Sequence, residues 1–124
     1  MLDLRMLPFL GVGLVKEGVV EADGTEQTVV EALGPMSLEG YIDLSEMQEG
    51  DAVIIKRYVR MTQDGEYKLH ASDEYYGRQT EPIVRLPPIS GLYGIKVTLQ
   101  QTSGTYRAFR YLFFYQLFVF RRSW

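Results

Sequence analysis

The stretch Tyr93-Gly-Ile-Lys-Val-Thr-Leu-Gln-Gln-Thr102 decides the fold class, because apolar and polar residues alternate along it. An extended chain places Ile95, Val97 and Leu99 on one face, and the residues between them on the other. A period of two is typical of a strand that buries one face and leaves the other in water. The stretch therefore predicts a half-buried strand of an antiparallel sheet.

Closely spaced turn signals divide the rest of the chain into similar segments. β-branched and aromatic residues fill these segments, and none carries a sustained helical pattern of apolar residues. We expect about eight strands in an all-β fold, either a two-sheet antiparallel β-sandwich or a jelly roll. The turn signals are Asp23-Gly24, Gly34-Pro35, Gly50-Asp51, Asp64-Gly65, Tyr76-Gly77, Pro87-Pro88, Ser90-Gly91 and Ser103-Gly104.

Two pairs of neighbouring segments are expected to form β-hairpins. Each pair flanks an Asp-Gly dipeptide, which can adopt the positive φ angles that a tight turn requires. A further short strand is expected over Met36 to Asp43. The hairpins join residues 13–20 to 26–33 through Asp23-Gly24, and residues 52–62 to 66–73 through Asp64-Gly65.

Prolines and a short polar stretch indicate how the chain changes direction. A strand from Pro82 to Leu86, ended by Pro87-Pro88, fits the edge of a sheet, because proline cannot donate to a neighbouring strand. The stretch from Asp43 to Asp51 predicts a single helical turn, in which Leu44 and Met47 face inward. Such a turn would carry the chain from one sheet to the other.

Composition is consistent with one globular domain. The 124 residues are 46% hydrophobic and 23% charged. We expect a lead-in over residues 1–12 and a single β-sandwich domain over residues 13–124. No signal peptide is recognised at the N-terminus, and no apolar stretch is long enough for a membrane-spanning helix.

Charge is distributed unequally between the two halves. Met1 to Thr62 holds eleven acidic and five basic residues, and Gln63 to Trp124 holds five and eight. This difference either is ordinary surface scatter or indicates attraction between subunits of an assembly. Neither half is basic enough to predict nucleic-acid binding.

No catalytic apparatus is recognised, so we expect no enzymatic activity and no cofactor. The single histidine, His70, falls on the polar face of a predicted strand without a nucleophile motif, and cysteine is absent. Gly11-Val-Gly13 lacks the Lys and Ser or Thr of a phosphate loop. Any pair among sixteen acidic residues is a weak signal for glycoside hydrolysis.

Metal binding is also not expected. One histidine cannot supply a zinc site of the usual kind. A group of four acidic residues could ligate calcium, but its spacing differs from an EF-hand, so solvated loop charge is favoured. The group is Asp43, Glu46, Glu49 and Asp51.

Tyr75, Tyr76 and Arg78 lie in a stretch expected to form a polar loop from Asp73 to Thr80. Aromatic and guanidinium side chains on a loop could stack on a sugar ring or anchor a protein interface. The alternative is that the tyrosines pack at the end of a strand.

The last predicted strand, Ala108 to Phe120, is apolar on both faces. Eleven of its thirteen residues are apolar, interrupted only by Arg110 and Gln116. An antiparallel strand normally wets one face, so the second face needs cover. It could run through the core, pack on another subunit or touch lipid.

The stretch from Gly40 to Asp51, followed by Val-Ile-Ile and later by Tyr93 to Thr102, resembles small β-sandwich or jelly-roll proteins of virus and phage particles. The resemblance covers residues 13–115 and carries over no functional residue. It implies a virion location and a structural role as a capsid, decoration or tail-associated subunit.

We therefore expect a self-associating or assembly-bound structural protein, with a small carbohydrate- or peptide-binding module as the alternative. In the alternative, Tyr75, Tyr76 and Arg78 would contact the ligand. In the assembly, the interface would be formed by Phe113, Phe114, Phe118, Phe120, Arg121, Arg122 and Trp124.

Overall fold

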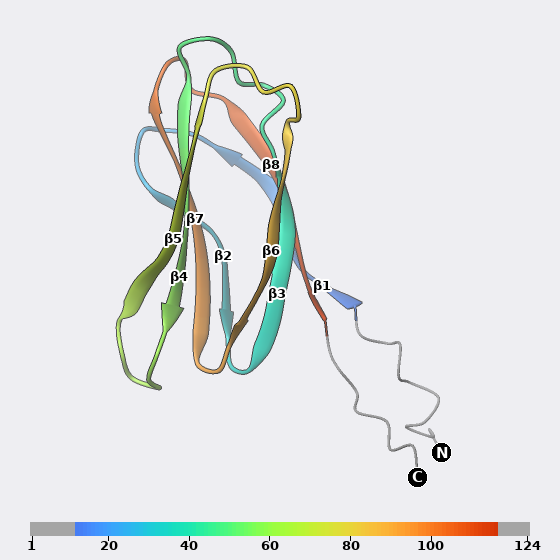
Figure 1. The fold of residues 1–124 in the computed structure, drawn as a ribbon, viewed down its shortest axis with the longest axis vertical. Helices are drawn as coiled ribbons and strands as arrows, with labels where there is room; N and C mark the ends of the chain where they lie inside the picture. The colour runs from blue at the N-terminus through green and yellow to red at the C-terminus, as the bar shows by residue number, and fades with distance from the viewer. Residues whose placement is uncertain (1–11, 117–124) are drawn as a thin grey trace.

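A computed structural model describes residues 12–116 of the chain, and these residues form an all-β sandwich (Figure 1). All strand pairs are antiparallel. The strands are β1 (Val12–Glu21), β2 (Gln27–Leu33), β3 (Met36–Asp43), β4 (Ala52–Arg60), β5 (Tyr67–Tyr76), β6 (Ile83–Gly91), β7 (Gly94–Ser103) and β8 (Ala108–Gln116).

The strand order in the two sheets is that of a jelly roll. One sheet has the order β1-β8-β3-β6, and the other has the order β2-β7-β4-β5. Only the β4–β5 connection stays within one sheet, and every other connection in residues 12–116 crosses to the opposite sheet. The second expected hairpin is thus confirmed, with β4 paired to β5.

The expected first hairpin is wrong. Strand β1 pairs with β8 and strand β2 pairs with β7, so the two segments lie in different sheets. The turn chemistry itself is present: Gly24 has a φ of 88°, and Asp23 Oδ1 accepts a hydrogen bond from Thr25 N at 2.9 Å. An Asp-Gly turn can connect strands in two different sheets as well as the strands of a hairpin. Here β1 and β2 pair with β8 and β7, which come much later in the sequence.

Strand β7 matches its prediction closely. Ile95 and Leu99 are fully buried, and Val97 is 1% exposed. Thr98 lies on the opposite face but is only 2% exposed, because Glu26 reaches over it and accepts its hydroxyl hydrogen bond at 2.7 Å. The face expected to be in water is therefore partly covered by side chains of its own sheet.

The edge position of the proline-flanked strand is confirmed, but its end is not. Strand β6 lies at the edge of its sheet and continues through Pro87-Pro88 to Gly91. The pairing changes register between Leu38–Ile89 and Gly40–Leu86, which places both prolines in a bulge. A bulge at an edge removes the need for the two missing N–H donors.

The connection from β3 to β4 contains two successive reverse turns in place of the single helical turn that we expected. Met47 N donates to Leu44 O at 3.1 Å, and Asp51 N donates to Gln48 O at 3.0 Å. Leu44 and Met47 are both fully buried, as predicted, and Gly50 has a φ of 93°. The inward apolar side chains anchor the crossover to the core.

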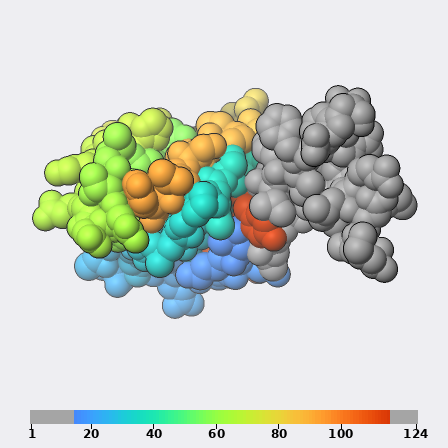
Figure 2. Space-filling model, turned by 90° about the horizontal axis from the view of Figure 1, so that it is seen from below, coloured from blue at the N-terminus to red at the C-terminus, as the bar shows by residue number. Residues whose placement is uncertain are grey.

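The two ends of the sandwich differ in what they carry. The connections 22–26, 44–51, 77–82 and 104–107 meet at one end, which we call the loop end (Figure 1). Strand β1 begins and β8 finishes at the opposite end, where Val12 pairs with Gln116. Figure 2 looks at this opposite end and shows β8 in red beside β1 in blue.

Candidate assembly surface

Strand β8 lies between β1 and β3, and its two faces have different surroundings. Phe109 and Phe113 are 0% and 1% exposed, and Tyr111 is 8% exposed, so this face forms part of the core between the sheets. On the other face Leu112 is 38% exposed and Arg110 is exposed. Over the described part of the strand, the outer face is therefore not buried within the chain.

Across the sheet, register places the outer side chains in rows, because paired residues of adjacent antiparallel strands point to the same side. One row contains Glu17, Leu112, Tyr41 and Arg85, from β1 to β6. Its centre is apolar, with Tyr41 36% and Leu112 38% exposed, and its two ends carry opposite charges. Both rows lie on the outer face of the sheet. We call this one the inner row, because it lies farther from the loop end than the row described next.

A second row, nearer the loop end, has the reverse arrangement. It contains Val19, Arg110, Asp43 and Ile83, again from β1 to β6. Val19 is 46% and Ile83 53% exposed at its two ends, and the opposite charges lie in the middle. We call this the outer row, and we call the two rows together the assembly surface.

Contacts within the chain hold several side chains of the assembly surface in place. The rings of Tyr41 and Phe114 are tilted against each other with centroids 6.1 Å apart. Arg85 Nη2 pairs with Glu39 Oε2 at 3.3 Å, where Glu39 is only 8% exposed. Arg110 makes no ion pair with any residue in the described part of the chain.

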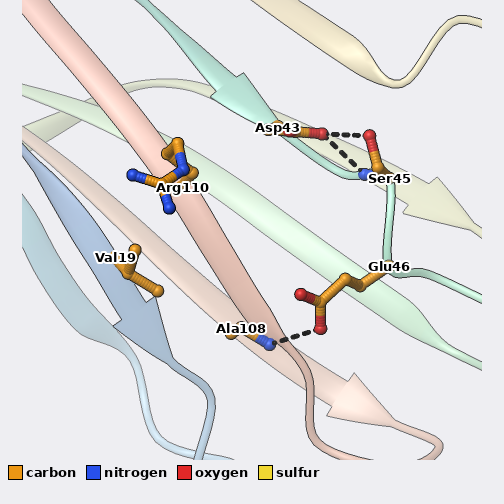
Figure 3. A pocket seen from close by; sticks show the side chains of 6 residues that line it. All are labelled: Val19, Asp43, Ser45, Glu46, Ala108 and Arg110. Carbon is orange, nitrogen blue, oxygen red and sulfur yellow. Dashed lines mark hydrogen bonds between the residues drawn. The ribbon is translucent and has the colours of Figure 1, made fainter.

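A shallow hollow of about 160 Å³ marks the loop end of this surface. Figure 3 shows Arg110 and Val19 on neighbouring strands, with Asp43, Ser45 and Glu46 to their right. Asp43 Oδ1 accepts from Ser45 N at 2.8 Å, and Glu46 Oε1 accepts from Ala108 N at 3.4 Å. Both carboxylates thus accept hydrogen bonds from backbone N–H groups.

The interface residues predicted from the sequence are only partly described by the structure. Phe114 lies on the outer face, as the prediction requires, and is partly buried. Phe113 points to the core and is 1% exposed, so its side chain is not part of the outer surface. The alternation of the strand dictates this, because adjacent residues face opposite sides. Outside the described residues lie Phe118, Phe120, Arg121, Arg122 and Trp124.

Tyr75, Tyr76 and Arg78 do not form one contact surface. The expected loop is wrong for Asp73 to Tyr76, which belong to β5. Tyr75 packs against the core, and burial raises the pKa of its hydroxyl. Tyr76 points away, is 67% exposed and donates to Glu74. Arg78 Nη2 donates to Gln48 Oε1 at 2.5 Å.

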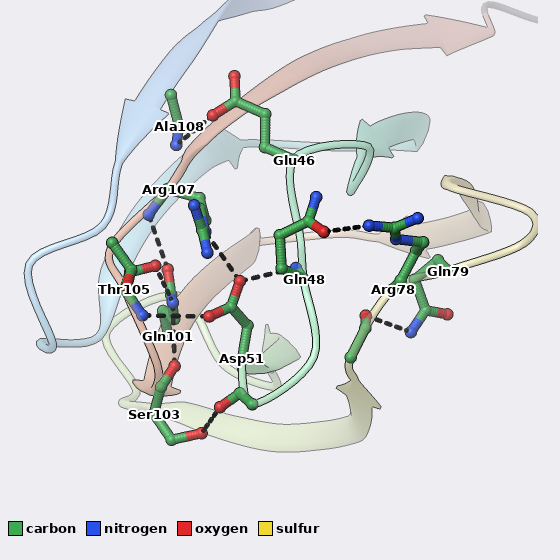
Figure 4. Close-up of polar contacts among 12 residues, drawn as sticks. Glu46, Gln48, Asp51, Arg78, Gln79, Gln101, Ser103, Thr105, Arg107 and Ala108 are labelled. Carbon is green, nitrogen blue, oxygen red and sulfur yellow. Dashed lines mark hydrogen bonds and ion pairs between the residues drawn. The ribbon is translucent and has the colours of Figure 1, made fainter.

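The four acidic residues considered for calcium serve different contacts. Among residues 12–116 no cluster of His, Cys, Asp or Glu is arranged to hold a metal ion. The expectation of solvated charge is wrong for Asp51, which is 3% exposed. Its Oδ2 accepts from Arg107 Nε and from Gln48 N, each at 2.8 Å, and its Oδ1 accepts from Thr105 N at 3.1 Å. Figure 4 shows that Asp51, in the connection 44–51, contacts Thr105 and Arg107 in the connection 104–107 at the loop end.

The pKa of Asp51 follows from this network. Burial acts to raise the pKa of the carboxyl, but the hydrogen bond and charge of Arg107 and the two backbone donors outweigh it and hold the pKa below its ordinary value. Gln101, which is 1% exposed, extends the network: its Nε2 donates to Thr105 O at 2.7 Å, and its Oε1 accepts from Arg107 N at 2.9 Å. Buried polar contacts therefore join the connections 44–51 and 104–107 at the loop end.

A second polar group on the outer face of the other sheet was not predicted from the sequence. Lys96 Nζ lies 4.8 Å from the ring centre of Tyr58 and 4.9 Å from that of Tyr67. Tyr67 donates to Glu31 Oε2 at 2.6 Å, and burial together with this carboxylate raises the pKa of Tyr67 to about 12. Lys96 could be placed on an outer face from its alternation, but its neighbours depend on strand order.

His70 lies at the register shift of β5 and is exposed. It lines an open groove of about 600 Å³ between the sheets, together with Ser90 and Arg57.

Residues 12–116 contain no helix with the length and hydropathy that a membrane crossing requires. No protein-family model matches the sequence, and a search of curated proteins found no match. Among solved structures, the chain is similar to the VP2 subviral particle of infectious bursal disease virus, with a TM-score of 0.47 and 15% sequence identity. The similarity covers 86% of this chain and 33% of VP2, so the chain spans about a third of that protein.

Proposed function

We propose that this chain is a non-enzymatic structural subunit of a larger protein assembly. The observation that carries the proposal is the assembly surface, in which exposed apolar side chains cross all four strands of one sheet at Val19, Leu112, Tyr41 and Ile83. The row Glu17, Leu112, Tyr41 and Arg85 has apolar groups at its centre and charged groups at its ends, an arrangement that is typical of protein interfaces.

The jelly-roll strand order supports a specific kind of assembly. Jelly-roll domains form viral capsids and also occur in lectins and cupins. The fold is therefore compatible with a capsid, decoration or tail-associated subunit of a virus or phage particle, among other functions. Strand β8 supports the same proposal, because the apolar sequence continues from Leu117 to Phe120. The separation of Tyr75 from Tyr76 makes the carbohydrate-binding module the weaker alternative.

The experiment is a measurement of mass in solution over a range of protein concentrations, followed by electron microscopy. We expect the purified chain to form oligomers, seen as rings, shells or filaments in the micrographs. Leu112→Glu should shift the chain to smaller species, because it places a charge at the centre of the assembly surface. Leu69→Glu is the matched control, since Leu69 is 57% exposed on the other sheet.

A chain that stays monomeric from about 1 to 500 μM would overturn the proposal, because subunits that pack through the assembly surface must self-associate at least weakly in this range. Equal loss of assembly in Leu112→Glu and Leu69→Glu would also count against the assembly surface. Circular dichroism of both variants must show the β-sheet signal of the wild type, so that a change in mass reports association.

A further inference from the structure

The assembly surface is complementary to itself. From β1 to β6 the inner row runs acidic, apolar, apolar, basic, through Glu17, Leu112, Tyr41 and Arg85. The outer row, Val19, Arg110, Asp43 and Ile83, runs apolar, basic, acidic, apolar. In both rows, reversing the direction exchanges each charge for its opposite and each apolar residue for another.

A second copy of this chain presents that reversed order if it is related by a two-fold axis that lies between β8 and β3 and runs parallel to them. The rotation turns the second sheet face to face with the first and keeps each row opposite itself. Glu17 then lies opposite Arg85 of the second copy, and Arg110 lies opposite Asp43. Leu112 lies opposite Tyr41, and Val19 opposite Ile83. An isologous interface requires this kind of self-complementarity.

The other face-to-face two-fold arrangement lacks this match. An axis perpendicular to the strands leaves the order along each row unchanged. If it passes through a row, Glu17 faces Glu17 or Arg110 faces Arg110. If it passes between the rows, Leu112 faces Arg110 and Tyr41 faces Asp43. Each charged group is then buried against an apolar side chain without an opposite charge as its partner. Charge therefore selects the axis parallel to the strands.

We infer that two copies of this chain form a dimer by packing their β1-β8-β3-β6 sheets face to face about a two-fold axis parallel to β8 and β3. This inference rests on the proposed assembly function and adds the partner and the geometry. Aligned packing of two sheets is a common arrangement of β-sheets. In the dimer both loop ends point the same way, and β1 begins and β8 finishes at the opposite end in both copies.

A charge-reversal experiment tests the geometry. Glu17→Lys places a lysine opposite Arg85 of a second identical copy, and Arg85→Glu places a glutamate opposite Glu17. Each variant alone should self-associate about tenfold more weakly than the wild type, since each dimer contains two like-charge contacts. An equimolar mixture should restore wild-type association, because a mixed dimer pairs the introduced lysine with the introduced glutamate and keeps the native pair of Arg85 with Glu17.

A second pair of variants avoids the contact of Arg85 with the nearly buried Glu39. Val19→Lys and Ile83→Glu change side chains at opposite edges of the sheet that face each other only in the dimer. The same rescue by mixing is expected. Glu66→Lys and Lys68→Glu form the control pair beside the β4–β5 turn, where both side chains are 70% or more exposed and no effect of mixing is expected.

The outcomes separate the two proposals. A wild-type chain that assembles, with neither pair of variants showing weakened self-association and rescue, overturns the two-fold geometry and leaves the assembly function standing. A monomeric wild-type chain overturns both. Rescue by mixing in the Val19 and Ile83 pair supports the dimer even if Arg85→Glu does not fold.

Discussion

Replacing Asp51 with Asn tests whether the buried network at the loop end stabilises the fold. The substitution keeps the size of the side chain but removes its charge and one of its two acceptor atoms. Asp51 accepts three hydrogen bonds from Arg107, Gln48 and Thr105, and its side chain is only 1% exposed. At least one hydrogen-bond donor and the charge of Arg107 therefore lose their partner. The site is nearly buried, so water cannot easily take the place of the lost carboxylate oxygen.

Removing one partner of a buried ion pair costs about 3–5 kcal/mol, and hydrogen bonds to charged groups contribute about 1.5–3 kcal/mol each without adding fully. The Arg107 side chain is 26% exposed, so we expect the low end of the range, about 3 kcal/mol of unfolding free energy. Urea denaturation at pH 7 measures this loss. Asp73→Asn is the matched control, because Asp73 also pairs with an arginine but is 53% exposed, and its loss should be at most about 1 kcal/mol.

The pH dependence provides an independent check. The pKa of Asp51 in the fold lies below its ordinary value of 3.8, so its contribution to stability is present above that pH and is lost as the pH falls through the lower folded value. The Asp51→Asn variant should lose less stability than the wild type on acidification. Equal losses for Asp51→Asn and Asp73→Asn at pH 7, or parallel acid profiles for the variant and the wild type, would refute this account of the loop end.

Two further predictions concern the core and the second sheet. Phe109→Ala should lower the unfolding free energy by about 3–5 kcal/mol in urea denaturation, because Phe109 is fully buried; a loss below about 1 kcal/mol would contradict its place in the core. The pKa of Tyr67 is raised to about 12, so the stability that it contributes is complete below pH 10 and is lost as the pH rises toward 12. Absorbance titration of Glu31→Gln should show Tyr67 ionising at lower pH than in the wild type, and an unchanged titration would rule out the Glu31 contact as a cause.

Much of the fold was predictable because local pattern and tertiary structure agree. Strand β7 alternates strictly and lies at the centre of its sheet, and the β4–β5 hairpin joins neighbours in sequence. The error at Asp23-Gly24 arose where they disagree. The turn residues describe the local backbone, whereas the partners of β1 and β2 are decided by burial against strands made much later in the chain.

The candidate surface was predicted only in part, for a similar reason. The sequence of β8 shows that two faces are apolar, which led to Phe114, but it does not show which face meets the core. It therefore assigned Phe113 to the interface, although Phe113 is buried. The rows of the assembly surface combine residues from four strands, and a shift of one residue in any register would turn their side chains to the other face.

The place of β8 also determines the order in which the fold can be completed. Within residues 12–116, the first strand, β1, has the last strand, β8, as its sheet partner, with Val20 opposite Phe109. At synthesis rates of about 5–20 residues per second, Phe109 is made roughly 4 to 18 seconds after Val20. During this time β1 has no neighbour in its sheet, and β3 is paired on at most one side. Closing such distant contacts is slow, so the nascent chain exposes the edges of β1 and β3 until β8 emerges. Chaperone dependence and sensitivity to truncations that remove β8 are the expected consequences for expression of this protein.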